Sequence, residues 1–305
     1  MEVNLRKLDK QIFDNTIRVF VAASPSEWLP ARVLEFSIRE QTYFSVEVQY
    51  LYLSGIEMPV PNDSENKPRT PFSFQRFLIP ELCGYSGKAI YLDADMQVFR
   101  DVSQLWNQPF LGCDLQTVQK KGGGRYEQFS VLLLDCEQLK WNIEEIVKKL
   151  DSGMLDYSGL MYNMEVASKI GRNIPPEWNS LEAYNPEATA LLHYTDMNTQ
   201  PWISLFNPLD YLWISCLRRA ISKGFISEKE IECEVSAKHV RPSLLAQLET
   251  DIDIGIKLPR NIKVMDKGYK APYHYLKVGS KRPWASVSKW LLAGFRKAIY
   301  KYANF

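Results

Sequence analysis

This sequence has almost no excess charge of either sign. Its 37 Lys and Arg residues stand against 36 Asp and Glu residues, which leaves a formal net charge of +1. A nearly neutral chain offers no global electrostatic attraction to nucleic acid or to acidic partners. The sequence also lacks a run of about 18 uncharged apolar residues, as a membrane-spanning helix needs, and an apolar stretch of signal-peptide length near its first residues. We therefore expect a cytoplasmic protein that neither spans a membrane nor binds nucleic acid.

The sequence is also poor in cysteine, and its cysteines show no paired spacing. The five are Cys83, Cys113, Cys136, Cys216 and Cys233. Their odd number and wide separation do not match a zinc site and favour a reducing compartment. Apolar residues, by contrast, are plentiful, at 46% hydrophobic and 12% aromatic. A chain of 305 residues with this composition can bury a substantial core, in one large domain or two ordinary ones.

Short apolar runs alternate with amphipathic stretches along the chain. Residues 17–23 (IRVFVAA) predict a buried strand, and the SPSE that follows at 24–27 is a helix-start signature. Residues 31–40 predict that helix, and residues 46–53 (VEVQYLYL) predict a second strand. Further strands are expected at 88–92, 132–134 and 191–194, and further helices at 72–85 and 141–150. The alternation predicts an α/β fold with parallel strands.

One predicted strand ends in two charged residues. In the stretch AIYLDADMQV, at 89–98, Asp93 and Asp95 follow four apolar or aromatic residues. Side chains two apart on an extended chain point the same way, and ligands of open parallel sheets bind beyond the carboxyl ends of the strands. Two neighbouring carboxylates are stabilised by a cation, and hard oxygen ligands favour magnesium or manganese. The pattern therefore predicts a divalent-metal site.

The D-x-D spacing alone is a weak signal. Asp is a common residue, so a chain of this length contains about one such pair by chance. Asp251 and Asp253 repeat the spacing after a polar helical stretch, where a loop with Gly and Pro begins. We interpret this second pair as solvated.

Four segments resemble the family 8 glycosyltransferases, and they occur in that family's order. The segment RFLIPELCGYSGKAIYLDADMQVF, at 76–99, contains the two aspartates, and RVFVAASPSEWLPARVLEFSIRE, at 18–40, resembles the family's first strand and helix. YEQFSVLLLD, at 126–135, resembles its Asn-containing strand, and HYTDMNTQPW, at 193–202, resembles its HFxGxxKPW motif. The resemblance implies a GT-A fold, with a Rossmann-like mixed sheet flanked by helices and a helical C-terminal extension. It also implies retaining transfer of a hexose from a UDP-sugar to a glycan or lipid-linked acceptor, with Mn2+ or Mg2+.

The same resemblance implies roles for individual residues. Asp93 and Asp95 match the metal-binding aspartates, and His193 matches the third protein ligand. The positions that match the family's donor site, its cofactor-binding residues, are Ala22, Ala23, Ser24, Arg76, Asp93, Ala94, Asp95, Asp114 and Gln200. The positions that match its catalytic residues are Arg76, Gln128 and Asp156.

For five of the donor positions the resemblance implies a more specific contact. The backbone of Ala22 and Ala23 would lie against uracil and ribose, and Ser24 would stand at the uracil contact. Arg76 matches the basic residue at the donor phosphates. It could alternatively be a surface helix charge. Asp114 matches an acceptor of a sugar hydroxyl.

This sequence departs from the family pattern in two places. Gln200 replaces the phosphate-contacting Lys, a loss for which Arg76 or the basic loop KKGGGR at 120–125 could compensate, unless that loop is only a solvated turn. The family's DQD stretch is also missing. LDYSGLMYNM, at 155–164, occupies its region, with Asp156 as the counterpart, while Gln128 stands at the Asn position that faces the transferred sugar.

Other readings stay open. The fold could serve as a catalytically silent sugar-nucleotide sensor or as a scaffold of a glycan-assembly complex. A nucleotidyltransferase also places aspartates at a strand end, but the Gly-rich basic signature of that class is missing from VAASPSEW at 21–28. His239 and His274 are interpreted as ordinary polar residues.

The last residues have their own composition. We expect a GT-A domain over residues 1–250 and a C-terminal extension over 251–305. Within the extension, residues 284–305 interleave aromatic and basic side chains. That pattern is typical of a helix at a membrane interface, here the inner face, but a terminal helix docked on the core has the same pattern.

Overall fold

The computed structural model describes residues 16–119 and 129–274 of the chain. The chain divides after Tyr273 into two compact units, Met1–Tyr273 and His274–Phe305. The aromatic and basic stretch at 284–305 lies outside the described residues, and the expected domain boundary at residue 250 stays a prediction. Within the described residues, no helix combines the length and the apolar character that crossing a bilayer requires.

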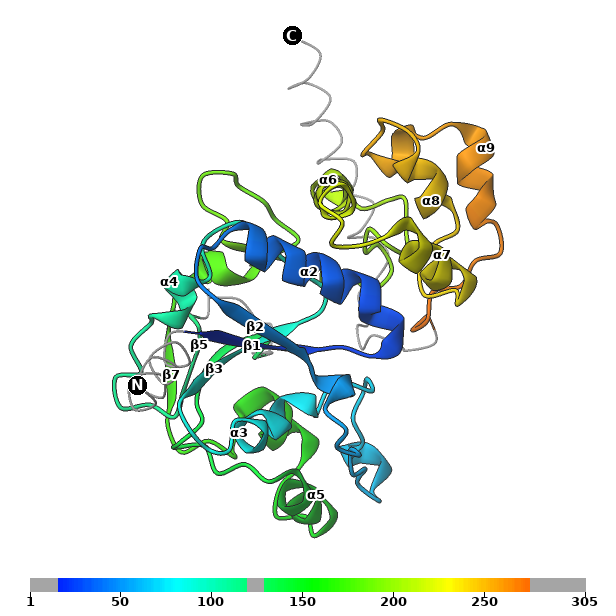
Figure 1. The fold of residues 1–305 in the computed structure, drawn as a ribbon. Helices are drawn as coiled ribbons and strands as arrows, with labels where there is room; N and C mark the ends of the chain where they lie inside the picture. The colour runs from blue at the N-terminus through cyan, green and yellow to red at the C-terminus, as the bar shows by residue number, and fades with distance from the viewer. Residues whose placement is uncertain (1–15, 120–128, 275–305) are drawn as a thin grey trace, which may run out of the picture. The chain divides into compact units, whose positions relative to one another are not determined.

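A six-stranded mixed sheet forms the centre of the first unit (Figure 1). In spatial order its strands are β2 (Val46–Tyr50), β1 (Ile17–Ala22), β3 (Lys88–Asp93), β6 (Val131–Asp135), β5 (Leu115–Val118) and β7 (Ile170–Ile174). Strand β1 pairs in parallel with β2 and β3, β6 runs antiparallel to β3 and β5, and β7 is parallel to β5. The parallel β1–β2 pair confirms the prediction from the first strand, helix and strand.

A second, three-stranded sheet continues from β3. It consists of β4 (Met96–Val98), β9 (Leu191–His193) and β8 (Ser180–Leu181). Strand β4 runs antiparallel to β9, and β8 is parallel to β9. Because only Ala94 and Asp95 separate β3 from β4, the chain passes directly from one sheet to the other there.

Helices cover both faces of the large sheet. Figure 1 shows α2 (Trp28–Glu40) on one face, and α3 (Ile79–Leu82) and α5 (Ile143–Asp151) on the other. The remaining α-helices are α4 (Ser103–Trp106), α6 (Asp210–Ser222), α7 (Glu228–Ser236), α8 (Ser243–Leu248) and α9 (Arg260–Lys263). Short 3-10 turns are η1 (Pro25–Glu27), η2 (Leu51–Leu53), η3 (Ser64–Asn66), η4 (Gln75–Leu78), η6 (Pro176–Asn179), η7 (Gly255–Lys257) and η8 (Val264–Asp266), and η5 (Gly159–Asn163) is a π-helical turn. A mixed sheet flanked by helices is the architecture that the family resemblance implied, and the antiparallel β6 departs from the parallel strands that the alternation alone predicted.

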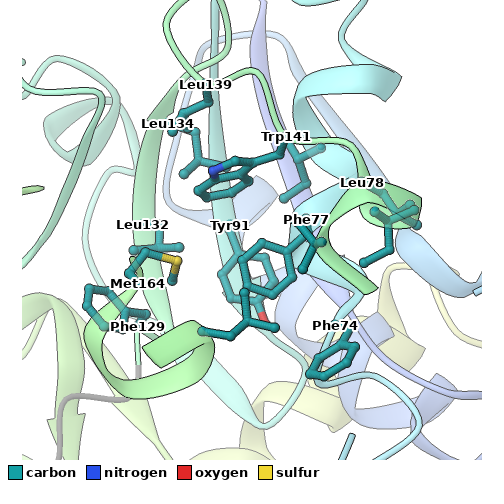
Figure 2. Close-up of a cluster of buried hydrophobic side chains, with 14 of the residues drawn as sticks. Phe74, Phe77, Leu78, Tyr91, Phe129, Leu132, Leu134, Leu139, Trp141 and Met164 are labelled. Carbon is teal, nitrogen blue, oxygen red and sulfur yellow. The ribbon is translucent and has the colours of Figure 1, made fainter. Parts of the chain in front are cut away.

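The central strands are apolar on both faces, and successive residues enter different cores. Along β3, Tyr91 packs into the cluster under α3 and α5, whereas Ile90 and Leu92 pack into the cluster under α2. Figure 2 shows the aromatic side chains around Tyr91, where the rings of Phe77 and Trp141 lie 5.2 Å apart. Each such buried side chain contributes roughly 1.5–3 kcal/mol. Because side chains alternate along a strand, this two-sided burial fixes the register of β3 and so the position of Asp93 at its end.

A third cluster lies on the outer side of α2. Leu29 and Val33 of this helix pack with Trp213 and Leu217 of α6. Helix α2 is therefore buried on two sides, between the sheet and the helices that follow β9.

Two predicted elements differ from the structure. The strand expected at 46–53 ends at Tyr50 and continues as the turn η2. The helix expected at 72–85 is instead η4 followed by the four-residue α3. Pro80, at the start of α3, has no N–H to donate to the preceding turn, so one continuous helix cannot form through it.

Candidate functional site

The two aspartates of the D-x-D pattern lie where the large sheet meets the small one. Asp93 is the last residue of β3, and Asp95 immediately precedes β4. The N–H of Ala94 donates to the carbonyl of Ala22 over 3.1 Å, which extends the β1–β3 pairing into this turn. The turn is thus fixed against the carboxyl end of β1, as predicted for a ligand site of such a sheet.

His193 reaches the same point through the pairing of β4 with β9. Met96 is the register partner of His193, and the N–H of Tyr194 donates to the carbonyl of Asp95 over 2.9 Å. This pairing places His193 Nε2 3.0 Å from Asp95 Oδ1. One ligand atom each from Asp93, Asp95 and His193 lies within 4.8 Å of the other two. The predicted triad therefore comes together in the structure.

The donor set and its surroundings fit a divalent cation. Asp95 Oδ1 is buried and accepts no hydrogen bond from any described residue, although Nε2 of His193 lies close to it. His193 Nδ1 lies 3.0 Å from Asn179 Oδ1, and an Nδ1–H donated to this oxygen leaves the lone pair of Nε2 facing the aspartates. Two carboxylates and one imidazole are a suitable ligand set for manganese, and magnesium accepts the carboxylates.

Arg76 and Tyr91 surround the other aspartate. Tyr91 donates its hydroxyl to Asp93 Oδ1 over 2.5 Å, and Arg76 Nη2 lies 3.9 Å from the same oxygen. The Arg76 guanidinium is buried over the Tyr91 ring and donates from Nη1 to the carbonyl of Phe129 over 2.8 Å. The alternative interpretation of Arg76 as a surface helix charge is therefore wrong.

Negative charge accumulates around the triad. Burial alone would lower the pKa of His193, but the charges of Asp95, Asp93 and Glu182 outweigh it, so the pKa is raised. Burial, together with the charges of Asp95 and Asp93, also raises the pKa of Glu27 well above its usual value. Bringing a cation to the triad relieves this repulsion.

Glu27 is a site residue that the sequence reasoning used only as a helix-start signal. Its carboxylate accepts the N–H of Ser24 over 3.1 Å, as in a capping box. The same side chain lines a pocket with Gln200, His239 and Tyr273. An acidic residue a few positions after the end of β1, at the sheet edge that Asp93 occupies, was the available signal.

Gln200 orients Asp95. Its buried amide donates from Nε2 to Asp95 Oδ2 over 3.0 Å and to the carbonyl of Tyr194 over 2.9 Å. The residue that replaces the family's Lys thus directs a donor at a carboxylate of the candidate metal triad. Its predicted place in the donor site stays a prediction.

The predicted uracil-side residues lie beside the triad. Ala22 and Ala23 are fully buried at the end of β1. The amide of Gln75 pairs with the backbone of Ala23, as it accepts its N–H over 3.1 Å and donates to its carbonyl over 2.9 Å. Ser24 Oγ contacts the hydroxyl of Tyr273, which also accepts a hydrogen bond from Ser26 over 2.9 Å. A residue near the end of the described chain therefore contacts the predicted base-binding turn.

Among the described residues, the predicted sugar-side aspartates Asp114 and Asp156 bond to backbone groups outside the triad. Asp114 Oδ2 accepts the N–H groups of Ser168 and Lys169, over 2.7 and 3.1 Å. Asp156 Oδ1 accepts the N–H of Gly159 over 2.6 Å, at the start of η5. Gln128 and the KKGGGR loop lie outside the described residues. The roles of these residues at the transferred sugar stay predictions.

Comparisons with known proteins identify the family that this site resembles. Residues 31–133, which include Arg76, Asp93 and Asp95, match the model of Glycosyl transferase family 8. "Protein CDI" of Arabidopsis thaliana is 26% identical over 229 residues, which cover 65% of this chain and 85% of that protein. The predicted resemblance to family 8 glycosyltransferases is thereby confirmed.

A solved structure shares the fold at low sequence identity. The bifunctional glycosyltransferase WbbM aligns with a TM-score of 0.51 and 13% identity, over 72% of this chain and 51% of WbbM. The glycosyltransferase GlyE of Streptococcus pneumoniae TIGR4 aligns with a TM-score of 0.49 and 17% identity, over 69% of this chain and 64% of GlyE. This chain thus spans less than two-thirds of either protein. The expected GT-A fold is confirmed, and the family match supports a glycosyltransferase.

Proposed function

We propose that this chain transfers a hexose from a UDP-sugar to a glycan or lipid-linked acceptor, with retention of configuration and with a divalent cation, Mn2+ or Mg2+. The observation that carries this proposal is the convergence of Asp93, Asp95 and His193 at the carboxyl edge of the sheet, within a chain that matches a glycosyltransferase family.

The metal would be held by these three residues, and once bound it would neutralise the charge that accumulates on the departing diphosphate. The residues around the triad keep it in position before any ligand arrives. Asn179 holds the tautomer of His193, and Gln200 holds the rotation of the Asp95 carboxylate. Such preorganisation lowers the cost of assembling the site during the reaction.

Arg76 is the cation proposed to face the donor phosphates. Its guanidinium is fixed by the Phe129 carbonyl and the Tyr91 ring, beside Asp93. Because the group is buried, its charge is screened little by solvent and acts strongly on a nearby phosphate. The positive charge of Arg76 compensates for the uncharged Gln200, which stands at the position of the family's Lys.

A retaining transfer of this kind needs no strong general base. The acceptor hydroxyl approaches from the side that the diphosphate leaves, and a phosphate oxygen takes its proton while positive charge develops on the sugar ring. The proposed contributions of the chain on the sugar side are Asp114, Gln128 and Asp156. We further propose action in the cytoplasm, with residues 284–305 able to contact the inner face of the membrane.

The test is UDP release from UDP-sugars with manganese, in wild type, Asp95→Ala and Asp251→Asn. The matched control, Asp251, is an exposed aspartate of the other D-x-D pair. We expect turnover in wild type and the control and none in Asp95→Ala. Turnover that survives Asp95→Ala would contradict the metal role, and a thermal-shift screen of UDP, GDP and CMP sugars would identify the donor.

A silent sugar-nucleotide sensor is the second candidate. The observation that favours it is the amide of Gln200, which points at Asp95 where the family has a phosphate-binding cation. Tight UDP binding without turnover of any UDP-sugar in the same assay would establish this function instead.

A further inference from the structure

The segment from η7 to the end of η8 is firmly attached to the first unit on one side. Leu258 and Ile262 are buried against Leu205, in a small core of their own. The N–H of Gly255 donates to Asp210 Oδ2 over 2.6 Å, which joins η7 to the start of α6. The segment is thus a fixed surface element of this unit.

Apolar side chains of the same segment are exposed. Ile256, Val264 and Met265 are 40%, 54% and 46% exposed. Lys263 donates from Nζ to the carbonyl of Ile256 over 2.5 Å, so η7 and the start of η8 lie close together. Phe206, which follows the buried Leu205, is 74% exposed.

Basic side chains are interleaved with these apolar ones. Between residues 254 and 270 the basic residues are Lys257, Arg260, Lys263, Lys267 and Lys270. The one acidic residue in this interval is Asp266, whose carboxylate accepts the N–H and the hydroxyl of Ser243 over 2.8 and 2.7 Å. The basic–apolar patch, defined as Ile256, Val264, Met265 and these five basic residues, is therefore strongly cationic.

Other exposed apolar residues have a different setting. Leu111 and Met154 are 71% and 73% exposed, more than any apolar member of the patch. The residues around them, 109–114 and 151–156, contain acidic charge and no basic residue. The combination of apolar exposure with positive charge thus distinguishes the patch.

We propose that the basic–apolar patch binds the surface of an anionic lipid bilayer. Basic side chains are attracted to the acidic headgroups, and exposed apolar side chains between them enter the boundary with the acyl chains. Nucleic acid would match the charges but would offer no apolar layer for the exposed residues. The proposal does not depend on the proposed transferase activity, and it concerns residues other than the tail at 284–305.

The experiment is co-sedimentation of the full chain with vesicles of equal phosphatidylserine and phosphatidylcholine, and with vesicles of phosphatidylcholine alone. The charge variant is Lys257→Gln, Arg260→Gln and Lys267→Gln, and the apolar variant is Val264→Ser and Met265→Ser. The matched control is Leu111→Ser and Met154→Ser. Every substituted side chain is exposed, so all three variants should fold. Thermal melts of the three variants check this.

Wild type and control should bind the anionic vesicles and leave the neutral ones largely in solution. Each basic residue contributes about fivefold to such binding, so the charge variant should bind about a hundredfold more weakly. The apolar variant should bind the anionic vesicles about tenfold more weakly than wild type. Equal binding of wild type and both patch variants, as expected if the tail alone binds lipid, would overturn the proposal. So would loss in the charge variant alone, which would indicate a purely electrostatic polyanion site.

Discussion

The pairs Asp93–Asp95 and Asp251–Asp253 have the same spacing and opposite settings. The first lies at a strand end, with side chains 17% and 18% exposed. The second lies in the loop before η7, where Asp251 is exposed and Asp253 pairs with Arg218 Nε over 2.8 Å. Arg218 also donates to the carbonyls of Gln247 and Leu248. The interpretation of the second pair as solvated fits Asp251, whereas Asp253, with a side chain 36% exposed, also forms an ion pair that the sequence did not predict.

The difference between the pairs is in what already neutralises the carboxylates. An arginine side chain satisfies Asp253, so no cation is needed there. At the first pair, Asp95 Oδ1 is left without a hydrogen bond from the described residues, and burial with the charges of Asp95 and Asp93 raises the pKa of the nearby Glu27. The first pair therefore differs from the second in one buried carboxylate oxygen, Asp95 Oδ1, since Asp93 Oδ1 and Asp95 Oδ2 each accept a hydrogen bond.

The largest effect expected is on metal binding by the first pair. Asp93→Asn removes a charged ligand, so Mn2+ affinity should fall by about a thousandfold or more. Asp253→Asn, a substitution in the second pair, should bind Mn2+ like wild type. Titration of free Mn2+ by electron paramagnetic resonance measures both, and unchanged affinity in Asp93→Asn would remove the contrast between the pairs.

A pH-dependent effect on stability is expected from Asp210. This residue accepts the N–H of Gly255, just after the loop that contains the second pair. Burial raises the pKa of Asp210 to about 6 from its usual 3.8, although its carboxylate accepts the Gly255 N–H. A raised pKa in the folded state means stability that is present below the usual pKa and is lost as the pH rises through about 6. By this linkage, the free energy of unfolding of wild type should fall by up to ~3 kcal/mol, relative to that of Asp210→Asn, between about pH 4 and about pH 8.

Urea unfolding of both proteins at the two pH values measures this difference. Because all other groups titrate in both proteins, the comparison isolates Asp210. A constant difference between the two free energies of unfolding would show that Asp210 has an ordinary pKa.

A smaller effect on the first pair tests how His193 is positioned. Asn179→Ala removes the acceptor of His193 Nδ1 and should lower Mn2+ affinity by about 10–100-fold. Asn179→Asp keeps an acceptor oxygen and should restore most of the affinity. The exposed Asn62→Ala is the control, and full affinity in Asn179→Ala would show that the ring is held by packing alone.

The smallest effect concerns the ion pair of the second D-x-D. Asp253→Asn should lower the free energy of unfolding by about 0.5–1 kcal/mol, since the pair with Arg218 is only partly buried. Asp251→Asn should leave it unchanged. Urea unfolding distinguishes the two, and equal stability of both variants would mean that the second pair is solvated throughout, as the sequence suggested.

Local patterns predicted the central strands well. Apolar runs marked β1, β3, β6 and β9 because these strands are buried on both faces. The strands β4, β5, β7 and β8 escaped prediction, since polar residues or glycine interrupt most of them and their pairing depends on partners elsewhere in the chain. The missed break in the helix at 72–85 had a local signal in Pro80.

The amino-acid sequence by itself determined that two carboxylates end a buried strand, because strand periodicity and chain order are local properties. The sequence suggested His193 as their partner only through its resemblance to a family, and the tertiary structure decided how that residue and other distant groups meet them. The β4–β9 ladder brings His193 to Asp95, and Asn179 and Gln200 then orient these two side chains. Pairing between segments about a hundred residues apart depends on the packing of the whole sheet, so no short pattern encodes it.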